Sequence, residues 1–157
     1  MRRARGSDCK LLFEWANDAE VRQGAFQSEP IPWSEHCAWF AMKMNSSDAA
    51  IYIAEDDKGN AVGQVRFDIK PDGSAETDIS VAAFYRGRGL GSDMLRAAIT
   101  EFVKMYRVRE IVAQVKEDNE ASQRVFVKAG FVSARREPVK GRQVVRFVYL
   151  SSDNGIN

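Results

Sequence analysis

The chain has 157 residues, of which 45% are hydrophobic and 29% are charged, and its formal net charge at pH 7 is +1. This length is enough for one globular domain to bury its own core without disulfides or metal ions, and the near-zero charge gives no support for binding nucleic acid or a membrane surface. We therefore predict a single domain over residues 1–150, a tail at 151–157, and no metal site.

Helices are predicted in the first fifty residues. Asp8 is placed to cap a helix whose apolar stripe falls in residues 11–15, and a second short turn starts near Asp18. After a loop with two prolines, Ser34 is a candidate N-cap for a helix that runs through residue 44 with apolar side chains at helical spacing.

From residue 50 the hydrophobic pattern changes to alternation. Three antiparallel strands are predicted, separated by the turns D-K-G-N and P-D-G-S, and a helix over 91–106 and the strand E-I-V-A-Q-V-K follow. A helix from Glu120 should end at Gly130, with Phe131 folding back on Phe126, before two final strands. This order predicts an α/β fold: a mixed, mostly antiparallel sheet of six to seven strands with helices on both faces.

Residues 86–92, R-G-R-G-L-G-S, lie between a predicted strand and a predicted helix. A glycine-rich turn that opens a helix gathers free backbone N–H groups at the positive end of the helix dipole, which favours a phosphate; the alternative is a tight turn without a ligand. The spacing does not match G-x-G-x-x-G, because Ser92 takes the last position, and no lysine follows Gly91 as a P-loop requires.

Read as Arg86-x-x-Gly89-x-Gly91, the loop resembles the R/Q-x-x-G-x-G/A signature of the GNAT superfamily of acetyltransferases. Residues 119–131 are similar to the family's N-x-x-(A/S)-x-x-x-(Y/F)-x-x-x-G-F element. The resemblance implies the GNAT fold, in which the strand before the glycine loop and the next strand, the fourth and fifth of the family's sheet, splay apart.

The resemblance also implies acetyl-CoA as a co-substrate. Loop amides would hold its pyrophosphate, the splayed strand would hydrogen-bond its pantetheine arm, and the amide of Val81 or Ala82 would polarise the thioester carbonyl. The implied cofactor residues are Val81, Ala82, Ala83, Arg86, Gly87, Arg88, Gly89, Leu90, Gly91, Ser92, Asn119, Ser122 and Phe126. Asn119 can equally be a helix N-cap.

Two positions depart from the family pattern. Phe126 stands where many relatives have a tyrosine as general acid, and Gln114 stands where some have a glutamate. Coenzyme A can leave as a thiolate near neutral pH, because a thiol pKa is about 8.5, so a water or another hydroxyl can take the acid's place. Glu76, Asp78 and His36 are the candidate bases, against the alternative that they are solvent-facing or packing residues.

The N-terminal third contains L-F-E-W-A-N-D-A-E-V-R and then F-Q-S-E-P-I-P-W-S-E-H-C-A-W-F. These stretches are similar to the branch of the superfamily that includes sugar-nucleotide N-acetyltransferases, in particular to the enzyme that acetylates a UDP-linked 4-amino-4,6-dideoxy sugar on the way to pseudaminic acid. Aromatic side chains here can face a base or sugar, or simply form core. The candidate acceptor residues are Trp15, Asn17, Arg22, Phe26, His36 and Trp39.

The predicted activity is therefore direct N-acetyl transfer from acetyl-CoA to a small-molecule primary amine, with a UDP-amino sugar as the leading acceptor. A peptide N-terminal acetyltransferase and a non-catalytic acyl-CoA-binding module remain alternatives, and a homodimer is expected from the family. Cys9 and Cys37 have no metal-ligand spacing and read as free thiols, and the N-terminus shows no apolar leader, so we predict a cytoplasmic protein.

Overall fold

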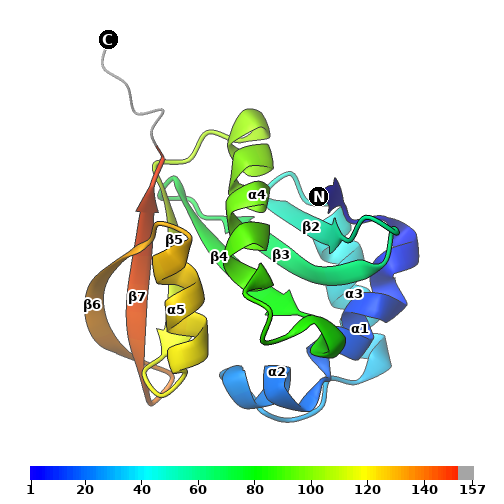
Figure 1. Ribbon diagram of the computed structural model, residues 1–157, viewed down its shortest axis with the longest axis horizontal. Helices are drawn as coiled ribbons and strands as arrows, with labels where there is room; N and C mark the ends of the chain where they lie inside the picture. Colours follow the sequence, from blue (N-terminus) through cyan, green and yellow to red (C-terminus); the bar gives the residue numbers. More distant parts are fainter. Residues whose placement is uncertain (152–157) are drawn as a thin grey trace.

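Seven strands form one mixed sheet in the order β1-β2-β3-β4-β5-β7-β6 (Figure 1). The computed structural model describes residues 1–151, and residues 152–157 of the predicted tail lie outside them. The strands are β1 (Arg2–Arg3), β2 (Ala49–Glu55), β3 (Ala61–Ile69), β4 (Ser74–Val81), β5 (Glu110–Lys116), β6 (Val132–Val139) and β7 (Arg142–Leu150).

Helices cover both faces of this sheet (Figure 1). The helices are α1 (Cys9–Ala16), α2 (Ala19–Gly24), α3 (Trp33–Met44), α4 (Leu90–Met105) and α5 (Glu120–Lys128). Helices α4 and α5 pack on one face, whereas α1 and α3 pack on the other face at the β1–β3 end. The α/β architecture predicted from the sequence is therefore confirmed.

Strand β2 is buried on both sides, which explains its continuous apolar run. Alternate residues point to opposite faces of a strand, so Tyr52 joins the α4 side of the core while Ile51 and Ile53 join the α1–α3 side. Because both layers meet on this strand, β2 fixes the position of the N-terminal helices relative to the rest of the sheet.

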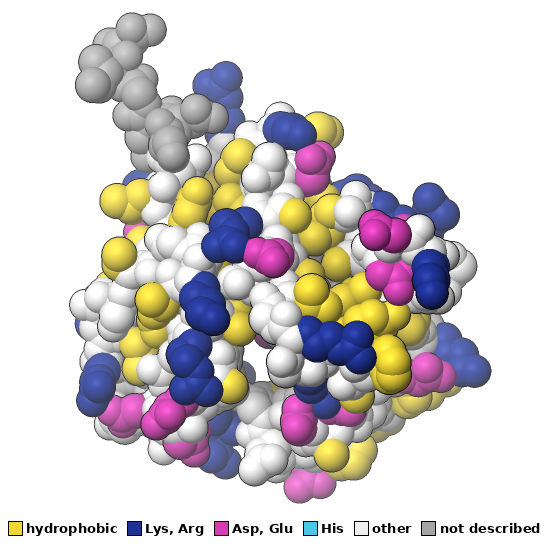
Figure 2. Space-filling model, in the orientation of Figure 1, with side chains coloured by type: hydrophobic (Ala, Val, Ile, Leu, Met, Phe, Trp, Pro, Cys, Tyr) yellow, Lys and Arg dark blue, Asp and Glu magenta, His cyan; other side chains and the backbone are white. Residues whose placement is uncertain are grey.

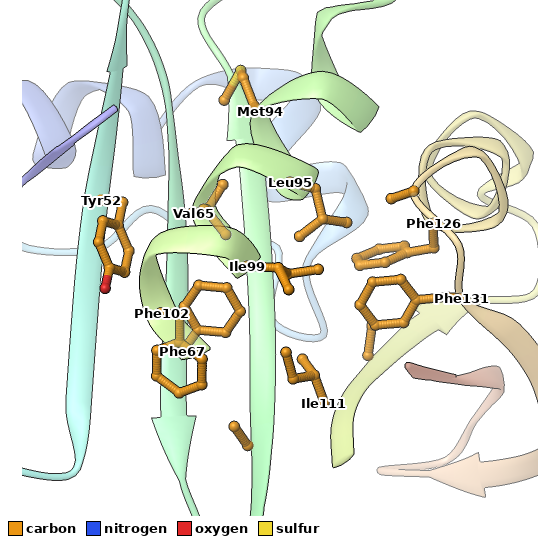
Figure 3. Packing of buried hydrophobic residues seen from close by; sticks show 14 of the residues in the cluster. Tyr52, Val65, Phe67, Met94, Leu95, Ile99, Phe102, Ile111, Phe126 and Phe131 are labelled. Carbon is orange, nitrogen blue, oxygen red and sulfur yellow. The ribbon is translucent and has the colours of Figure 1, made fainter. Parts of the chain in front are cut away.

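The main core lies between α4, α5 and the sheet (Figure 3). Phe67 of β3 stacks on Phe102 of α4 with ring centroids 4.2 Å apart, and both side chains are fully buried. Leu95 and Ile99 of α4 face Phe126 (Figure 3). Each such side chain contributes roughly 1.5–3 kcal/mol on burial, so this layer is the main support of the helix that begins at the glycine loop.

Strands β4 and β5 separate along their length. Their parallel pairing covers only Ser74–Glu76 against Glu110–Val112, whereas β5 stays paired with β7 through Lys116. The second half of β4 and the second half of β5 therefore border a gap, as the predicted splay requires.

Three details of the predicted elements were wrong. Strand β1 was not expected, because two arginines carry no strand signal and pairing with β2 alone defines them. Helix α3 begins at Trp33 after Pro32, one residue before the predicted cap. Asp8 does not cap α1 with its side chain, because its carboxylate accepts the Arg5 N–H at 2.7 Å and pairs with Arg2 at 2.8 Å.

Candidate active site

A cleft of about 1090 Å³ occupies the gap between β4 and β5. Its walls come from α1, α2 and α3 on one side and from the glycine loop, the first turn of α4 and the length of α5 on the other. Figure 2 shows the surface hollowed above α2, between α5 and the glycine loop. The cleft thus reaches both faces of the sheet, so two ligands can approach each other from opposite sides.

The glycines of the loop serve different purposes. Gly87 and Gly89 have φ angles of +73° and +74°, a region that side chains disfavour, and Gly89 is the N-cap residue of α4. Gly91 has ordinary φ, but a Cβ there would lie 3.1 Å from a methyl group of Val125, so its lack of a side chain lets α4 approach α5 closely. The first N–H groups of α4 consequently open into the cleft, where an anion is favoured.

Most of the predicted cofactor residues line this cleft. Those present in its wall are Val81, Arg86, Gly87, Gly89, Leu90, Gly91, Ser92, Asn119, Ser122 and Phe126. The exceptions are Ala82, Ala83 and Arg88, and the guanidinium of Arg88 instead lies over the ring of Phe84 at 4.7 Å. The glycine loop therefore borders this cleft, although three of the predicted cofactor residues do not.

Basic side chains also reach the cleft from α5, where Lys and Arg gather beside the hollow (Figure 2). Arg124 and Lys128 are the α5 cations in its wall, four residues apart and thus on one face of the helix. Together with the N-terminus of α4, they make this end of the cleft suitable for phosphate groups.

Arg86 is held by other protein groups. Its Nε donates to the Val81 carbonyl at 3.0 Å, and its two terminal nitrogens lie 2.7 Å from Asp18 Oδ1 and 3.0 Å from Glu20 Oε2. The hydrogen bond from Arg86 lowers the pKa of Asp18, which also caps α2. Arg86 therefore holds α2 against the end of β4, and a cofactor contact by the same guanidinium would compete with these carboxylates.

The β3–β4 register decides which backbone amides face the gap. In an antiparallel pair, alternate residues hydrogen-bond to the partner strand, and the Ala82 N–H donates to the Val62 carbonyl at 2.8 Å. The N–H groups of Ile79 and Val81 then point to the β5 side. Of the two amides predicted to polarise a thioester, Ala82 is occupied by β3, and Val81 remains the candidate.

Helix α5 begins and ends as predicted. The Asn119 side chain accepts the Ser122 N–H at 3.1 Å, which is an N-cap bond, and Gly130 has φ +100°. Phe126 is buried and contacts Phe131 edge-on, with centroids 5.2 Å apart. Phe126 is thus a core residue whose edge borders the cleft, and it supplies no proton.

The three candidate bases have different surroundings. Asp78 and Glu76 project from the same face of β4 into the cleft wall. Asp78 accepts a hydrogen bond from Gln64 at 3.3 Å and lies 3.8 Å from Arg66, and Glu76 lies 3.2 Å from Lys70. His36 is 2% exposed, and its Nε2 donates to the Cys9 carbonyl at 2.8 Å. Enclosed by aromatic rings of α1 and α3, His36 mainly joins these helices.

The predicted aromatic wall is present in part. Trp15, Phe26 and Trp39 line the cleft, and the guanidinium of Arg66 lies over the Trp39 ring at 5.3 Å. Asn17 does not line the cleft. Its side-chain oxygen instead accepts the Ile31 N–H at 2.7 Å and so stabilises the loop before α3.

Arg22 lines the cleft while bonding two carbonyl oxygens, those of Ala16 at 2.6 Å and Gln27 at 3.0 Å. Burial lowers the Arg22 pKa, and the charge of Asp78 opposes this shift. Arg22 and Asp78 thus influence each other electrostatically within the cleft.

Lys116 is the residue that sequence analysis missed. It ends β5, is 8% exposed, lines the cleft, and donates from Nζ to the Gln23 carbonyl at 2.8 Å. Within residues 1–151 its ammonium pairs with no carboxylate. A lysine at the end of a strand has no distinctive sequence signal; only the approach of α2 to β5 turns it into a buried cation.

These features define an α/β acyl-transfer domain: a strand that parts from its neighbour, leads into a glycine loop and exposes backbone amides beside an anion site. The chain belongs to the GNAT acetyltransferase domain family, because the family model described as "Acetyltransferase (GNAT) domain" matches residues 1–132. The predicted membership of the GNAT superfamily is thereby confirmed, and acetyl-CoA is the co-substrate of that family.

Two curated proteins are similar in sequence. MJ1062 of Methanocaldococcus jannaschii, described as uncharacterized, is 24% identical over 145 residues, which are 91% of this chain and 29% of that protein. YwnH of Bacillus subtilis, a putative phosphinothricin acetyltransferase, is 28% identical over 109 residues, 66% of this chain and 65% of that protein. The chain thus spans less than two thirds of either relative.

Solved structures share the fold. Spermidine N-acetyltransferase from Vibrio cholerae, in complex with CoA and spermine, has a TM-score of 0.84 at 19% identity and covers 96% of this chain and 94% of its own. AAC(6′)-Ib, in complex with ribostamycin and coenzyme A, has a TM-score of 0.82 at 19% identity, with 95% and 91% covered.

Residues 1–151 contain no group of His, Cys, Asp and Glu side chains placed to hold a metal ion. No helix in this part of the chain has the length and apolar character needed to cross a membrane. Cys9 and Cys37 are free and half-buried.

Proposed function

We propose that this chain transfers the acetyl group of acetyl-CoA directly to a primary amine of a small acceptor that also carries negative charge, with a UDP-linked amino sugar as the leading candidate. The negative charge of the acceptor is inferred from Lys116, whose buried ammonium lies in the cleft wall. Among the described residues, this ammonium contacts only a carbonyl oxygen, that of Gln23. Such a cation favours an anionic partner, because a buried charge is costly until it is paired.

The cofactor half of the cleft fits acetyl-CoA. The N-terminus of α4, with Arg124 and Lys128, would hold the phosphates, and the gap-facing amides of Ile79 and Val81 would hydrogen-bond the amide-bearing arm. Bound acetyl-CoA supplies an activated acetyl group as a thioester. The protein residues orient this group, exclude water and accept the proton of the attacking amine.

The acceptor half combines flat aromatic surfaces with cations. Trp15, Phe26 and Trp39 offer faces for a base or sugar ring, and Arg22 and Lys116 offer positive charge. Asp78 stands on the opposite wall, where it can accept a proton from the amine. This combination matches a molecule with a ring system, phosphates and one amino group.

A cationic acceptor is the second candidate, because carboxylates are also present in the cleft wall: Glu20, Glu35, Glu76 and Asp78. The structural neighbours that bind spermine and ribostamycin are consistent with it. Glu20 and Glu76 are already paired with Arg86 and Lys70, which leaves fewer carboxylates for a polyamine. A peptide acceptor and a purely acyl-CoA-binding role stay as outcomes of the test.

The test measures thiol release from acetyl-CoA with purified protein and a panel of amines: a UDP-4-amino-4,6-dideoxy sugar, spermidine, an aminoglycoside and a peptide with a free N-terminus. We expect turnover with the UDP-amino sugar at the highest kcat/KM. Preference for spermidine or the peptide would overturn the acceptor assignment. Binding of acetyl-CoA by calorimetry without turnover on any amine would indicate a non-catalytic module.

Lys116→Gln provides the matched variant, since it keeps a donor to the Gln23 carbonyl and removes the charge. Loss of a charged hydrogen bond costs about 1.5–3 kcal/mol, so KM for the UDP-amino sugar should rise by roughly 10- to 100-fold while the Kd of acetyl-CoA stays unchanged. An unchanged KM would show that Lys116 does not meet the acceptor.

A further inference from the structure

Thr77 lies where the cleft between β4 and β5 begins. The pairing of the two strands ends at Glu76 with Val112, so Thr77 is the first residue of β4 without a pairing partner in β5. Its side chain is 6% exposed and is part of the cleft wall. Neither the glycine loop nor any sequence motif points to this residue.

The hydroxyl of Thr77 makes no hydrogen bond within the described chain. Two buried side-chain atoms of residues 1–151 share this property, Thr77 Oγ1 and Tyr52 Oη, and of these two residues only Thr77 borders the cleft. A buried hydroxyl without a partner destabilises the folded state, and the large majority of buried side-chain polar atoms have a hydrogen-bond partner. Valine would fill the same space without this cost. We therefore expect the hydroxyl to have a hydrogen-bond partner in a bound ligand.

The surroundings of the hydroxyl define which ligand group it can meet. Ala75, Ile79 and Val81, which alternate with Thr77 on one face of β4, belong to the apolar core beneath α4 and α5. Val115, Val125 and Phe126 continue this apolar wall on the other side of the cleft. The channel that leads inward from the glycine loop is therefore apolar, and Thr77 is a polar group at its inner end.

We propose that Thr77 Oγ1 donates a hydrogen bond to the thioester end of bound acyl-coenzyme A, to its carbonyl oxygen or its sulfur. This inference rests on the proposed function. It gives the site a hydroxyl on the β4 side of the cleft, whereas Phe126 on the α5 side has none. Thr77 then positions the reacting group, and the hydrogen bond missing in the free protein is made when the cofactor arm reaches the strand junction.

The test compares Thr77→Val and Thr77→Ser with the unchanged protein by calorimetry, using acetyl-CoA, coenzyme A and adenosine 3′,5′-bisphosphate. The bisphosphate carries the nucleotide phosphates and no thioester, so it reports on the glycine loop alone. For Thr77→Val we expect a Kd for acetyl-CoA raised about three- to ten-fold, the loss of one hydrogen bond, and an unchanged Kd for the bisphosphate. Thr77→Ser should keep the acetyl-CoA affinity.

Acetyl-CoA and coenzyme A both carry the sulfur atom, but only acetyl-CoA carries the thioester carbonyl oxygen. A comparison of their Kd values therefore shows which atom accepts the hydrogen bond of Thr77. A weaker affinity for acetyl-CoA alone assigns the bond to the carbonyl oxygen, and an equal loss for coenzyme A assigns it to the sulfur. The proposal is overturned by an unchanged Kd for acetyl-CoA, by an equal loss for the bisphosphate, or by equal losses in Thr77→Ser and Thr77→Val. If the unchanged protein binds none of the three ligands, the proposed function itself fails.

Thermal unfolding supplies a readout that is independent of any ligand. Removing an unpaired buried hydroxyl should raise the Tm of ligand-free Thr77→Val by about 2–8 °C. A lowered Tm would show that the hydroxyl is already paired in the free protein and would overturn the inference. Thr100→Val is the control, because Thr100 is exposed on α4 and its hydroxyl donates to the Arg96 carbonyl.

Discussion

At the scale of single residues, the site combines residues that match the family pattern with residues that do not. Phe126 packs on Phe131 and Phe147, so the position that carries a proton donor in many relatives belongs here to the core. Gln114 borders the cleft without a charge. The proton of the amine must therefore be accepted elsewhere, and Asp78 lies closer to the open half of β4 than Glu76 does.

We expect Asp78→Asn to lower kcat by about 100-fold or more, which is the usual contribution of a general base. Glu76→Gln should have the smaller effect, because Glu76 lies where β4 is still paired with β5 and is closer to its cation, Lys70 at 3.2 Å, than Asp78 is to Arg66 at 3.8 Å. Steady-state kinetics of both variants show which of the two carboxylates accepts the proton of the amine. The reverse order of effects would assign the proton acceptor to Glu76.

At the scale of elements, α2 joins the two sides of the gap. Arg86 holds its first turn to the end of β4 through Asp18 and Glu20, and Lys116 of β5 donates to the carbonyl of Gln23 in its last turn. A six-residue helix has little stability of its own, so these long-range bonds keep it under the cleft (Figure 1). The shape of the acceptor side consequently depends on contacts made by the cofactor side.

Gly63 shows how strand packing sets the gap. A Cβ at this position would overlap the Ser80 carbonyl oxygen and the Met94 side chain. We expect Gly63→Ala to destabilise the protein by about 1–3 kcal/mol and to weaken acetyl-CoA binding, because Ser80 and Val81 must shift. Denaturant unfolding and calorimetry measure the two effects. Gly6→Ala is the control, since no atom lies within 4 Å of its added Cβ; equal stability of the two variants would contradict this account.

At the scale of the whole molecule, the N-terminus closes one edge of the sheet. Strand β1 pairs with β2, and Arg2 joins Asp8 and Glu55 at 2.8 Å and 2.6 Å. The hydrogen bond from Arg2 lowers the pKa of Asp8, with burial acting against it. A lowered carboxyl pKa adds stability above the unfolded value of about 3.9, and this stability is lost as pH falls through the folded pKa.

Asp8→Asn should therefore lower the free energy of unfolding by about 1–3 kcal/mol at pH 7, and this difference should shrink as pH falls below about 4. Urea unfolding of both proteins across pH 2–7 provides the measurement, with Asp57→Asn, at an exposed turn position, as the control. A difference that stays constant with pH would show that Asp8 contributes through packing and not through its charge.

Dimer formation and cytoplasmic location remain predictions. Strand β6 is the last strand of the sheet and exposes most of its residues, which is compatible with pairing between two copies. Sedimentation of the purified chain would determine its oligomeric state.

The sequence by itself determined the order of elements from α1 to β7, the glycine loop and the end of α5. These features depend on local rules: apolar periodicity, a helix that opens on glycines, and the left-handed conformation at Gly130. The tertiary structure alone decided what Arg86, Lys116 and Thr77 do. Their partners, or the lack of one, depend on how α2 and two diverging strands approach one another. Contacts between segments far apart in the chain leave no periodic signal in the residues that make them.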